Sequence, residues 1–404
     1  MADMSQDLAP HEMWAPQTRA NPLAFFNRER QRGPLLRQVD PNRGVPVWTT
    51  LSYKASVDAL KDPRFTKDEF NVPSAARLSR NADMEALNRN MLSMDPPDHT
   101  RLRTLVSKVF TPRSIEELRP RVALITHQLL DALRGKDRVD LIDDFAFHLP
   151  VTVIAELLGV PPEDHEQFRE WTTAVTLPAN AQNLEAITRA SKGFLHYFQG
   201  LIEQRRAAPR EDLISMLVQV RDEGSALTSQ ELVGMLYLLI VAGHDTTVNL
   251  IGNGVWALLR HPDQLERLRQ DPSLIGSAVE EMLRYRGPLE RSTSRWARED
   301  TEFHGQRIGR NDIVFASLLA ANHDPEQFPE PERFDITREP NRHIAFGYGI
   351  HFCLGAPLSR LEAAVALPLL LERFPRLRFA VDESELRWRG SLLMQGLERL
   401  PLAL

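Results

Sequence analysis

The pattern of apolar and polar positions along the chain predicts a mainly helical protein. Its longest helical pattern runs from about Ser229 to Arg260, opens with the capping-box pair Thr228 and Glu231, and stops at His261-Pro262. At 1.5 Å per residue, about 32 residues span roughly 48 Å, which is enough to cross an entire domain. We therefore expect one large domain, residues 1–404, with a long central helix.

Two further helical patterns have clear boundary residues. One covers about 272–285, between Asp271-Pro272 and Gly287-Pro288, and the other runs from Pro357 through Leu371. The second pattern is apolar on nearly every side, which is typical of a deeply buried helix.

Strand-like patterns are short and lie near the two ends of the chain. They cover residues 45–50, 301–315, 378–381 and 386–404. Because Pro46 cannot donate a hydrogen bond to a neighbouring strand, the first pattern is an edge strand or begins at this proline. The predicted fold class is mainly α with minor β.

Composition and charge narrow the classes of function. The residues are 42% hydrophobic and 26% charged, as in ordinary globular proteins, and no Gly/Ser-rich run or repeat indicates a linker. A net charge of −6 argues against a nucleic-acid partner. Residues 1–27 lack the apolar centre of a signal peptide, and the most apolar helical stretch, 232–242, is shorter than the ~20 residues of a membrane span. We expect a cytoplasmic monomer that binds neither nucleic acid nor membrane.

The single cysteine, Cys353, excludes an intrachain disulfide and a Cys-rich zinc site. A lone cysteine is ordinarily a small buried apolar residue. Here Gly347, Gly349 and Gly355 crowd the segment around it, and a helix begins at about Pro357. The dipole and the free N–H groups of that helix lower the pKa of a thiol and favour the thiolate, which suits an iron ligand.

The centre of the long helix, Ala242–Thr247, has the sequence Ala-Gly-His-Asp-Thr-Thr. A glycine costs about 1 kcal/mol relative to alanine at such a position, and conflicts with helix propensity are expected at functional sites. Activation of dioxygen needs a small residue that leaves room, a hydroxyl that hydrogen-bonds the oxygen and a carboxylate that relays protons. Gly243, Thr246 and Asp245 offer these groups. The alternative is an Asp and a Thr on a solvated turn.

The segment around the cysteine resembles the signature of the cytochrome P450 family, Phe-x-x-Gly-x-x-x-Cys-x-Gly. Phe346, Gly349, Cys353 and Gly355 stand at its four fixed positions, and Ala242–Thr246 is similar to the family's Ala/Gly-Gly-x-Asp/Glu-Thr pattern. The resemblance covers nearly the whole chain and implies the cytochrome P450 fold, with haem b bound through Cys353. A thiolate ligand favours cleavage of dioxygen, whereas a neutral imidazole favours its reversible binding.

The resemblance also implies roles for individual residues. Asp245 and Thr246 would be the catalytic acid–alcohol pair. Leu238, Ala242 and Thr246 recur at four-residue spacing and share one helix face, which we expect to cover the haem and touch substrate. The residues expected to bind the cofactor beside Cys353 are Ala242 and four partners of the haem propionates, His99, Arg103, Arg295 and His351.

Glu281 and Arg284 stand three residues apart on one helix face, where the ordinary interpretation is an exposed ion pair. In the family, an arginine in a segment like Pro331–Phe334 completes a buried Glu-Arg-Arg cluster. The resemblance therefore implies that Glu281, Arg284 and Arg333 are structural residues that hold the cysteine loop in shape.

Residues 70–94 have an irregular pattern with a short predicted helix, and the matching region of the family closes over the substrate. For each candidate pocket residue, ordinary core packing is the alternative. The expected pocket residues are Met91, Leu92, Met94, Leu238, Leu289, Thr293 and Leu393.

The sequence shows no reductase after the cysteine motif, so we expect electrons to come from a separate ferredoxin with its reductase. Five basic residues fall in segments that the family places near the cysteine side. They either form a docking patch for an acidic ferredoxin or are scattered solvated charges. They are Arg101, Lys108, Arg113, Arg342 and Arg360.

The predicted function is that of a haem-thiolate monooxygenase, which inserts one atom of O₂ into a small hydrophobic organic substrate by hydroxylation or epoxidation. The chain resembles soluble bacterial enzymes that act on macrolides and other natural products. Two alternatives stay open: an H₂O₂-dependent peroxygenase, in which the acid–alcohol pair is typically replaced, and a non-catalytic haem sensor or carrier. A sensor or carrier would not need Asp245 and Thr246 together.

Overall fold

The structure is a computed structural model. It describes residues 12–15, 18, 21–40, 44–73, 82–176, 182–220, 224–389 and 391–404. Parts of the segments 1–27 and 70–94, which were discussed above, lie outside these ranges.

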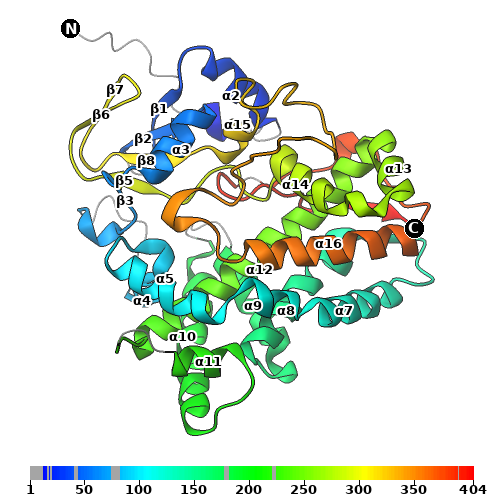
Figure 1. Ribbon diagram of the computed structural model, residues 1–404, viewed down its shortest axis with the longest axis horizontal. Coiled ribbons are helices and arrows are strands. Elements are labelled where there is room, and N and C mark those ends of the chain that lie inside the picture. The colour runs from blue at the N-terminus through cyan, green and yellow to red at the C-terminus, as the bar shows by residue number, and fades with distance from the viewer. Residues whose placement is uncertain are drawn as a thin grey trace.

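The long central helix is α12 (Ser229–Arg260), with the bounds that its sequence pattern predicts. The Thr228 hydroxyl accepts a hydrogen bond from the Glu231 N–H, and the Glu231 carboxylate accepts one from the Thr228 N–H, so the capping box is formed. Figure 1 shows α12 crossing the interior of the molecule behind α16 (Ala356–Arg373). Glycines allow neighbours to approach it closely: a Cβ at Gly252 would lie 2.5 Å from Ile142 Cδ1.

Most of the remaining helices surround α12. The main apolar core lies between them, and α8, α10, α14 and α16 pack directly on α12. The other helices are α2 (Pro22–Arg30), α3 (Tyr53–Lys61), α4 (Ala82–Asn88), α5 (Asp98–Val109), α6 (Pro112–Glu116), α7 (Arg119–Ala132), α8 (His148–Leu158), α9 (His165–Thr176), α10 (Leu184–Ala207), α11 (Leu213–Gln219), α13 (Pro262–Gln270), α14 (Ile275–Arg286) and α15 (Leu318–Asn322).

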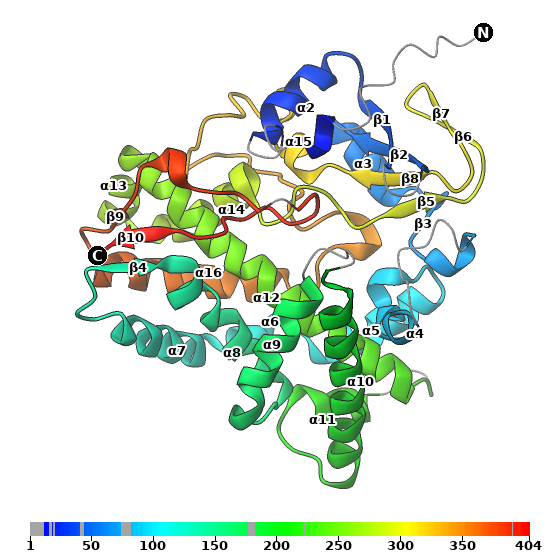
Figure 2. The ribbon, with the colours of Figure 1, turned by 180° about the vertical axis from the view of Figure 1, so that it is seen from behind.

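A five-stranded sheet lies with α2, α3 and α15 at one end of the molecule, and most helices lie at the other end (Figures 1 and 2). Its order is β1-β2-β8-β5-β3, in which β2 and β8 are parallel and the other pairs are antiparallel. As predicted, β2 begins at Pro46, and it lies inside the sheet rather than at an edge. The strands are β1 (Leu35–Val39), β2 (Pro46–Thr50), β3 (Phe65–Thr66), β5 (Arg295–Ala297) and β8 (Ile313–Ala316).

The remaining described strands form two small sheets. One has the order β4-β10-β9, and the other is the hairpin of β6 and β7. Their strands are β4 (Arg138–Asp140), β9 (Arg378–Phe379), β10 (Pro401–Ala403), β6 (Thr301–Phe303) and β7 (Gln306–Ile308). The mainly α fold with minor β is confirmed.

Two elements of the structure differ in detail from the sequence predictions. The helix expected over 272–285 begins with a separate 3₁₀ turn, Pro272–Leu274, before α14 starts. Among the described residues, the strand pattern of 386–404 yields β10 and two isolated bridges, one between Trp388 and Leu397 and one between Met394 and Leu289. In that stretch the Arg389 N–H donates to the Gly396 carbonyl, so the tail folds back on itself instead of extending along a sheet.

By length and composition, α12 is apolar enough to cross a membrane, although its stretch 232–242 is too short when taken alone. It is the one such helix found among the described residues. Its most apolar window is 72% buried inside the protein. Because the surrounding helices already cover this surface, α12 has the character of a core helix.

Candidate functional site

A cavity of about 390 Å³ lies where α12 passes the cysteine loop and the start of α16. It collects predicted site residues from segments far apart in the sequence. Those that line it are His99, Arg103, Ala242, Thr246, Arg295, His351 and Cys353, together with the expected pocket residues Met91, Leu92, Leu238, Leu289, Thr293 and Leu393. Met94 is not among the lining residues and packs against the main core instead.

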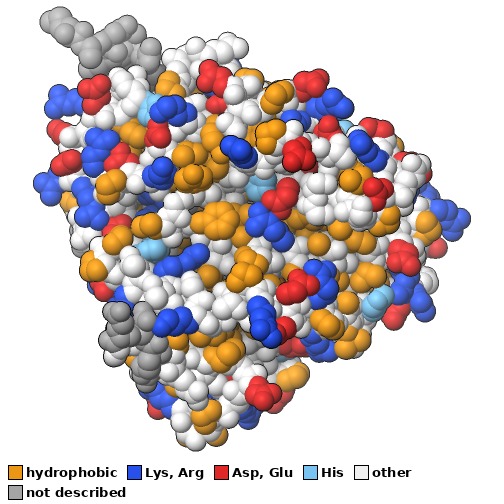
Figure 3. All heavy atoms as spheres, in the orientation of Figure 1, with side chains coloured by type: hydrophobic (Ala, Val, Ile, Leu, Met, Phe, Trp, Pro, Cys, Tyr) orange, Lys and Arg blue, Asp and Glu red, His pale blue; other side chains and the backbone are white. Residues whose placement is uncertain are grey.

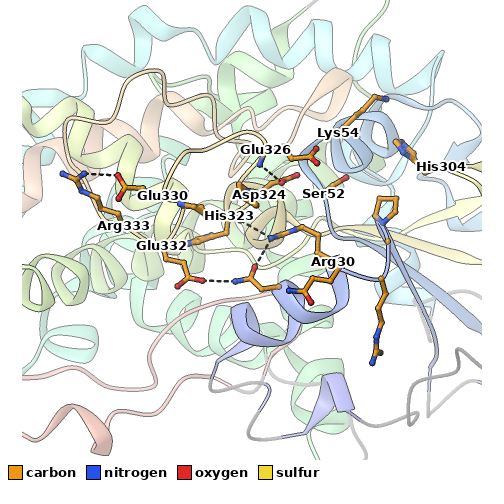
Figure 4. Close-up of a pocket in the computed structure, with 17 residues that line it drawn as sticks. Arg30, Ser52, Lys54, His304, His323, Asp324, Glu326, Glu330, Glu332 and Arg333 are labelled. Carbon is orange, nitrogen blue, oxygen red and sulfur yellow. Dashed lines mark hydrogen bonds and ion pairs between the residues drawn. The ribbon is translucent and has the colours of Figure 1, made fainter.

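A larger and more open cleft, about 1020 Å³, lies beside α2 and α3 (Figure 4). Its polar side chains are largely bonded to protein. Arg30, for example, donates to the carbonyls of Leu51, Ala320 and His323. Asn27 donates to Glu332 across the same cleft. None of the predicted catalytic or cofactor-binding residues lines this cleft, so the smaller cavity is the candidate site.

The cysteine loop bends sharply before α16. Gly347 and Gly349 have φ values of 76° and 75°, a backbone region that disfavours side chains, and the Cys353 N–H donates to the Phe346 carbonyl at 3.0 Å. Cys353 thereby presents its thiol to the cavity, where it is solvent-accessible.

Although its sulfur opens onto the cavity, Cys353 is surrounded by protein that desolvates the thiol, and this raises its pKa. The N–H groups of Gly355 and Ala356 and the charge of Arg103 favour the thiolate, as predicted, but they do not outweigh the desolvation. Coordination to a metal overrides this preference, because a coordinating thiol is deprotonated outright.

Positive groups gather at one side of the cavity. Arg295 is buried, which lowers its pKa to about 10, and Arg103 is half-buried. The rings of His99 and His351 lie 4.3 Å apart, and both ring nitrogens of His99 are buried without a hydrogen-bond partner. Burial and the nearby charges of Lys67, His99, Arg295 and Arg103 lower the pKa of His351 to about 2.

The sequence interpretation missed Lys67, which joins this positive group. Lys67 is buried and donates to Thr293 Oγ1 and to the Ser294 carbonyl at 3.0 Å, and burial lowers its pKa far below the ordinary value. Nothing in the local pattern around Lys67 marks it, because its position depends on pairing of β3 with β5. Such a concentration of donors fits the two carboxylates of a haem, which would accept hydrogen bonds from the orphaned nitrogens and offset the charge.

On α12, Leu238, Ala242 and Thr246 all line the cavity, as their spacing predicts. The Thr246 hydroxyl donates to the Ala242 carbonyl at 2.8 Å. Asp245 is buried and does not line the cavity; its Oδ1 lies 3.4 Å from His244 Nδ1, and its Oδ2 has no partner. Burial lowers the pKa of His244 to about 4, so this ring is neutral at physiological pH.

The Glu281 carboxylate is fully buried and binds several groups. Arg284 donates to both of its oxygens at 2.8 Å, and the Asp335 N–H and Asn341 Nδ2 donate as well. The second arginine is Arg338, whose Nε lies 3.2 Å from Glu281 Oε1.

The predicted role of Arg333 is therefore wrong. Its side chain is 58% exposed and pairs with Glu330, because the neighbouring Phe334 is the residue that turns into the core. Only its backbone takes part in the cluster, where its carbonyl accepts from Arg284 and Arg338. Arg338 stands five residues after Arg333 in the same segment, so the sequence offered a second candidate arginine for this role.

The expected basic patch is largely neutralised within the protein. Arg101 pairs with Glu231, Arg113 with Glu117 and Arg360 with Glu280. Figure 3 shows positive and negative side chains interspersed over one face of the molecule. The cysteine loop instead exposes three large apolar side chains, those of Tyr348, Ile350 and Phe352.

A second missed residue is Glu362 of α16, which lines the cavity. It is 1% exposed, and burial raises its pKa to about 8, opposed only by the Thr247 hydroxyl. The signal was a carboxylate beside a run of apolar residues in α16, nine residues after the cysteine.

Comparison with known proteins agrees with this arrangement. The family profile described as Cytochrome P450 matches residues 172–385. The chain is 47% identical to cytochrome P450 107B1 of Saccharopolyspora erythraea, covering 92% of this chain and 93% of that protein. It is also 47% identical to the cytochrome P450 monooxygenase PikC of Streptomyces venezuelae, covering 95% and 91%.

Among solved structures, the myxobacterial cytochrome P450 CYP267B1 in complex with myristic acid matches with a TM-score of 0.92 and 46% identity, over 97% of this chain and 98% of that one. The chain therefore belongs to the cytochrome P450 family of haem-dependent monooxygenases.

Proposed function

We propose that this protein inserts one atom of dioxygen into a small hydrophobic organic substrate, by hydroxylation or epoxidation, with electrons from a separate ferredoxin and its reductase. One observation carries the proposal. Cys353 and Thr246 line the same cavity as the basic residues Arg103 and Arg295. Apolar side chains such as Met91, Leu92 and Leu393 form much of its remaining wall. The name of the relative PikC supports a monooxygenase, and the myristic acid bound to CYP267B1 supports a hydrophobic substrate.

We assign the haem-binding roles to residues of this cavity. Haem with a thiolate ligand supplies the iron chemistry that activates dioxygen. Cys353 would provide the thiolate, and Ala242 would contact the haem from α12. The propionate partners would be His99, Arg103, Arg295 and His351, with Lys67 close behind them.

We assign proton delivery to Asp245 and Thr246. The Thr246 side chain faces the cavity, and its hydroxyl can exchange the Ala242 carbonyl for a group in the cavity. Asp245 lies immediately behind it with an unpartnered carboxylate oxygen, Oδ2. A buried acceptor next to a cavity-facing hydroxyl suits the transfer of protons from outside the cavity to Thr246. This pair favours a monooxygenase over the peroxygenase and the sensor.

The redox partner would dock on the cysteine loop. Ile350 exposes an apolar side chain there beside Tyr348 and Phe352, which also line the cavity, and Lys61 lies over the Tyr348 ring and adds positive charge. An acidic ferredoxin fits a surface with an apolar centre and a positive rim. We propose that the protein is a cytoplasmic monomer; the bacterial origin of the relatives agrees with the cytoplasmic location.

The first test is the absorbance of the reduced protein with CO. We expect the wild-type protein to show the long-wavelength Soret band typical of thiolate ligation, and Cys353→His to lose that band because imidazole replaces the thiolate. Survival of the band in the variant would refute the assignment of Cys353. A second assay separates the reaction classes. Product formation with reduced ferredoxin would identify a monooxygenase, whereas turnover with H₂O₂ alone would identify a peroxygenase.

A further inference from the structure

Glu362 is an isolated carboxyl group in the wall of the cavity. Its two oxygens are buried without a hydrogen-bond partner of adequate geometry, and among the described residues no ion pair includes it. An ionised carboxylate in such a position would be very costly, so the group is stable only as a neutral acid. Its pKa of about 8 is consistent with that form at neutral pH.

Other charged groups on the helices packed against α16 are engaged elsewhere. Glu280 of α14 binds Arg360 and His343, and Asp131 of α7 binds Arg373 near the far end of α16. Asp245 of α12 lies beside His244, and Glu116 of α6 pairs with Arg119. None of these groups contributes to the pKa of Glu362, where burial and the Thr247 hydroxyl are the two causes.

The Thr247 hydroxyl joins α12 to α16. It donates to Ser359 Oγ at 3.3 Å, which leaves its oxygen lone pairs for a donor on its other side. Thr247, Ser359 and Glu362 all line the cavity. Thr247 adjoins Thr246 in the chain, and α16 begins three residues after Cys353, so this link connects the helices that carry the two sides of the proposed site.

We propose that Glu362 is a positioning residue: its carboxylic acid donates to the Thr247 hydroxyl and, through it, fixes α12 against α16 at the cavity. This proposal rests on the proposed function, because the geometry it maintains is that between Thr246 and Cys353. Ionisation of Glu362 removes the donated proton and places an unpaired charge between the helices, so the position of α12 changes as pH rises.

The test uses the haem-loaded protein and measures product formed per electron pair consumed, on either side of pH 8. We expect the wild-type ratio to fall severalfold as pH rises through about 8, the pKa of Glu362. Glu362→Gln keeps a donor amide that cannot ionise, so its ratio should stay constant across this range. Thr247→Val removes the hydroxyl that links Glu362 and Ser359 to α12, so its ratio should be low on both sides of pH 8.

Glu372→Gln is the matched control, because Glu372 lies on the same helix and is exposed; its profile should follow that of the wild type. A transition that persists unchanged in Glu362→Gln, or a wild-type ratio that does not change with pH, would overturn the proposal.

An infrared measurement separates this proposal from the proposed function. The wild-type protein at pH 7 should show a carboxylic-acid C=O stretch that shifts in D₂O and disappears in Glu362→Gln. If that band is found but the CO and product assays fail, the monooxygenase proposal fails while the neutral acid stands. If the assays succeed and the band is missing, the role of Glu362 is wrong.

Discussion

At the scale of single residues, Thr246 shows how a side chain within a helix can be available to a ligand. Its hydroxyl is satisfied by the Ala242 carbonyl one turn earlier, yet it faces the cavity. An intrahelical bond of this kind is weak enough to be exchanged for a ligand, because Ser and Thr gain little net stability from it.

We expect Thr246→Ala to bind haem normally while wasting electrons. Product per NAD(P)H should fall severalfold and H₂O₂ release should rise, since the hydroxyl that delivers protons is lost. Thr246→Ser, which retains the hydroxyl, is the control and should recover most of the product yield. Unchanged coupling in Thr246→Ala would contradict the role assigned to this residue.

At the scale of elements, the Glu281 cluster ties α14 to the segment that leads into the cysteine loop. The buried carboxylate receives donors from Arg284 on its own helix and from Arg338 and Asn341 beyond it. Breaking a buried charged hydrogen bond leaves the carboxylate partly unsatisfied, which costs more than the loss of an exposed pair.

We expect Arg338→Ala to lower the free energy of unfolding by about 2 kcal/mol, the scale of a hydrogen bond to a buried charge. Arg333→Ala should change it by less than ~0.5 kcal/mol, because the exposed Arg333 side chain pairs only at the surface. Denaturant titration of both variants measures the difference. Equal losses would show that Arg333 supports the cluster after all.

At the scale of the whole molecule, sequence periodicity and motifs predicted the main features well. The bounds of α12 followed from its capping box and from His261-Pro262, which are local signals. Thirteen of the expected catalytic, haem and pocket residues line one cavity, because the family motifs specify which segments meet.

What the sequence could not provide depends on contacts between distant segments. Lys67 reaches Thr293 only through strand pairing, and the exchange of Arg338 for Arg333 depends on which side chain of that segment turns inward. The sign of the Cys353 pKa shift depends on burial, which the favourable donors of the loop do not reveal.

The lone cysteine of the chain also has an analytical consequence. Because Cys353 is the only thiol in 404 residues, a thiol-reactive dye can mark one atom of the molecule and nothing else. If that sulfur is an iron ligand, the fraction of protein that resists the dye equals the fraction loaded with cofactor. The same cysteine then reports, molecule by molecule, how completely a preparation has matured.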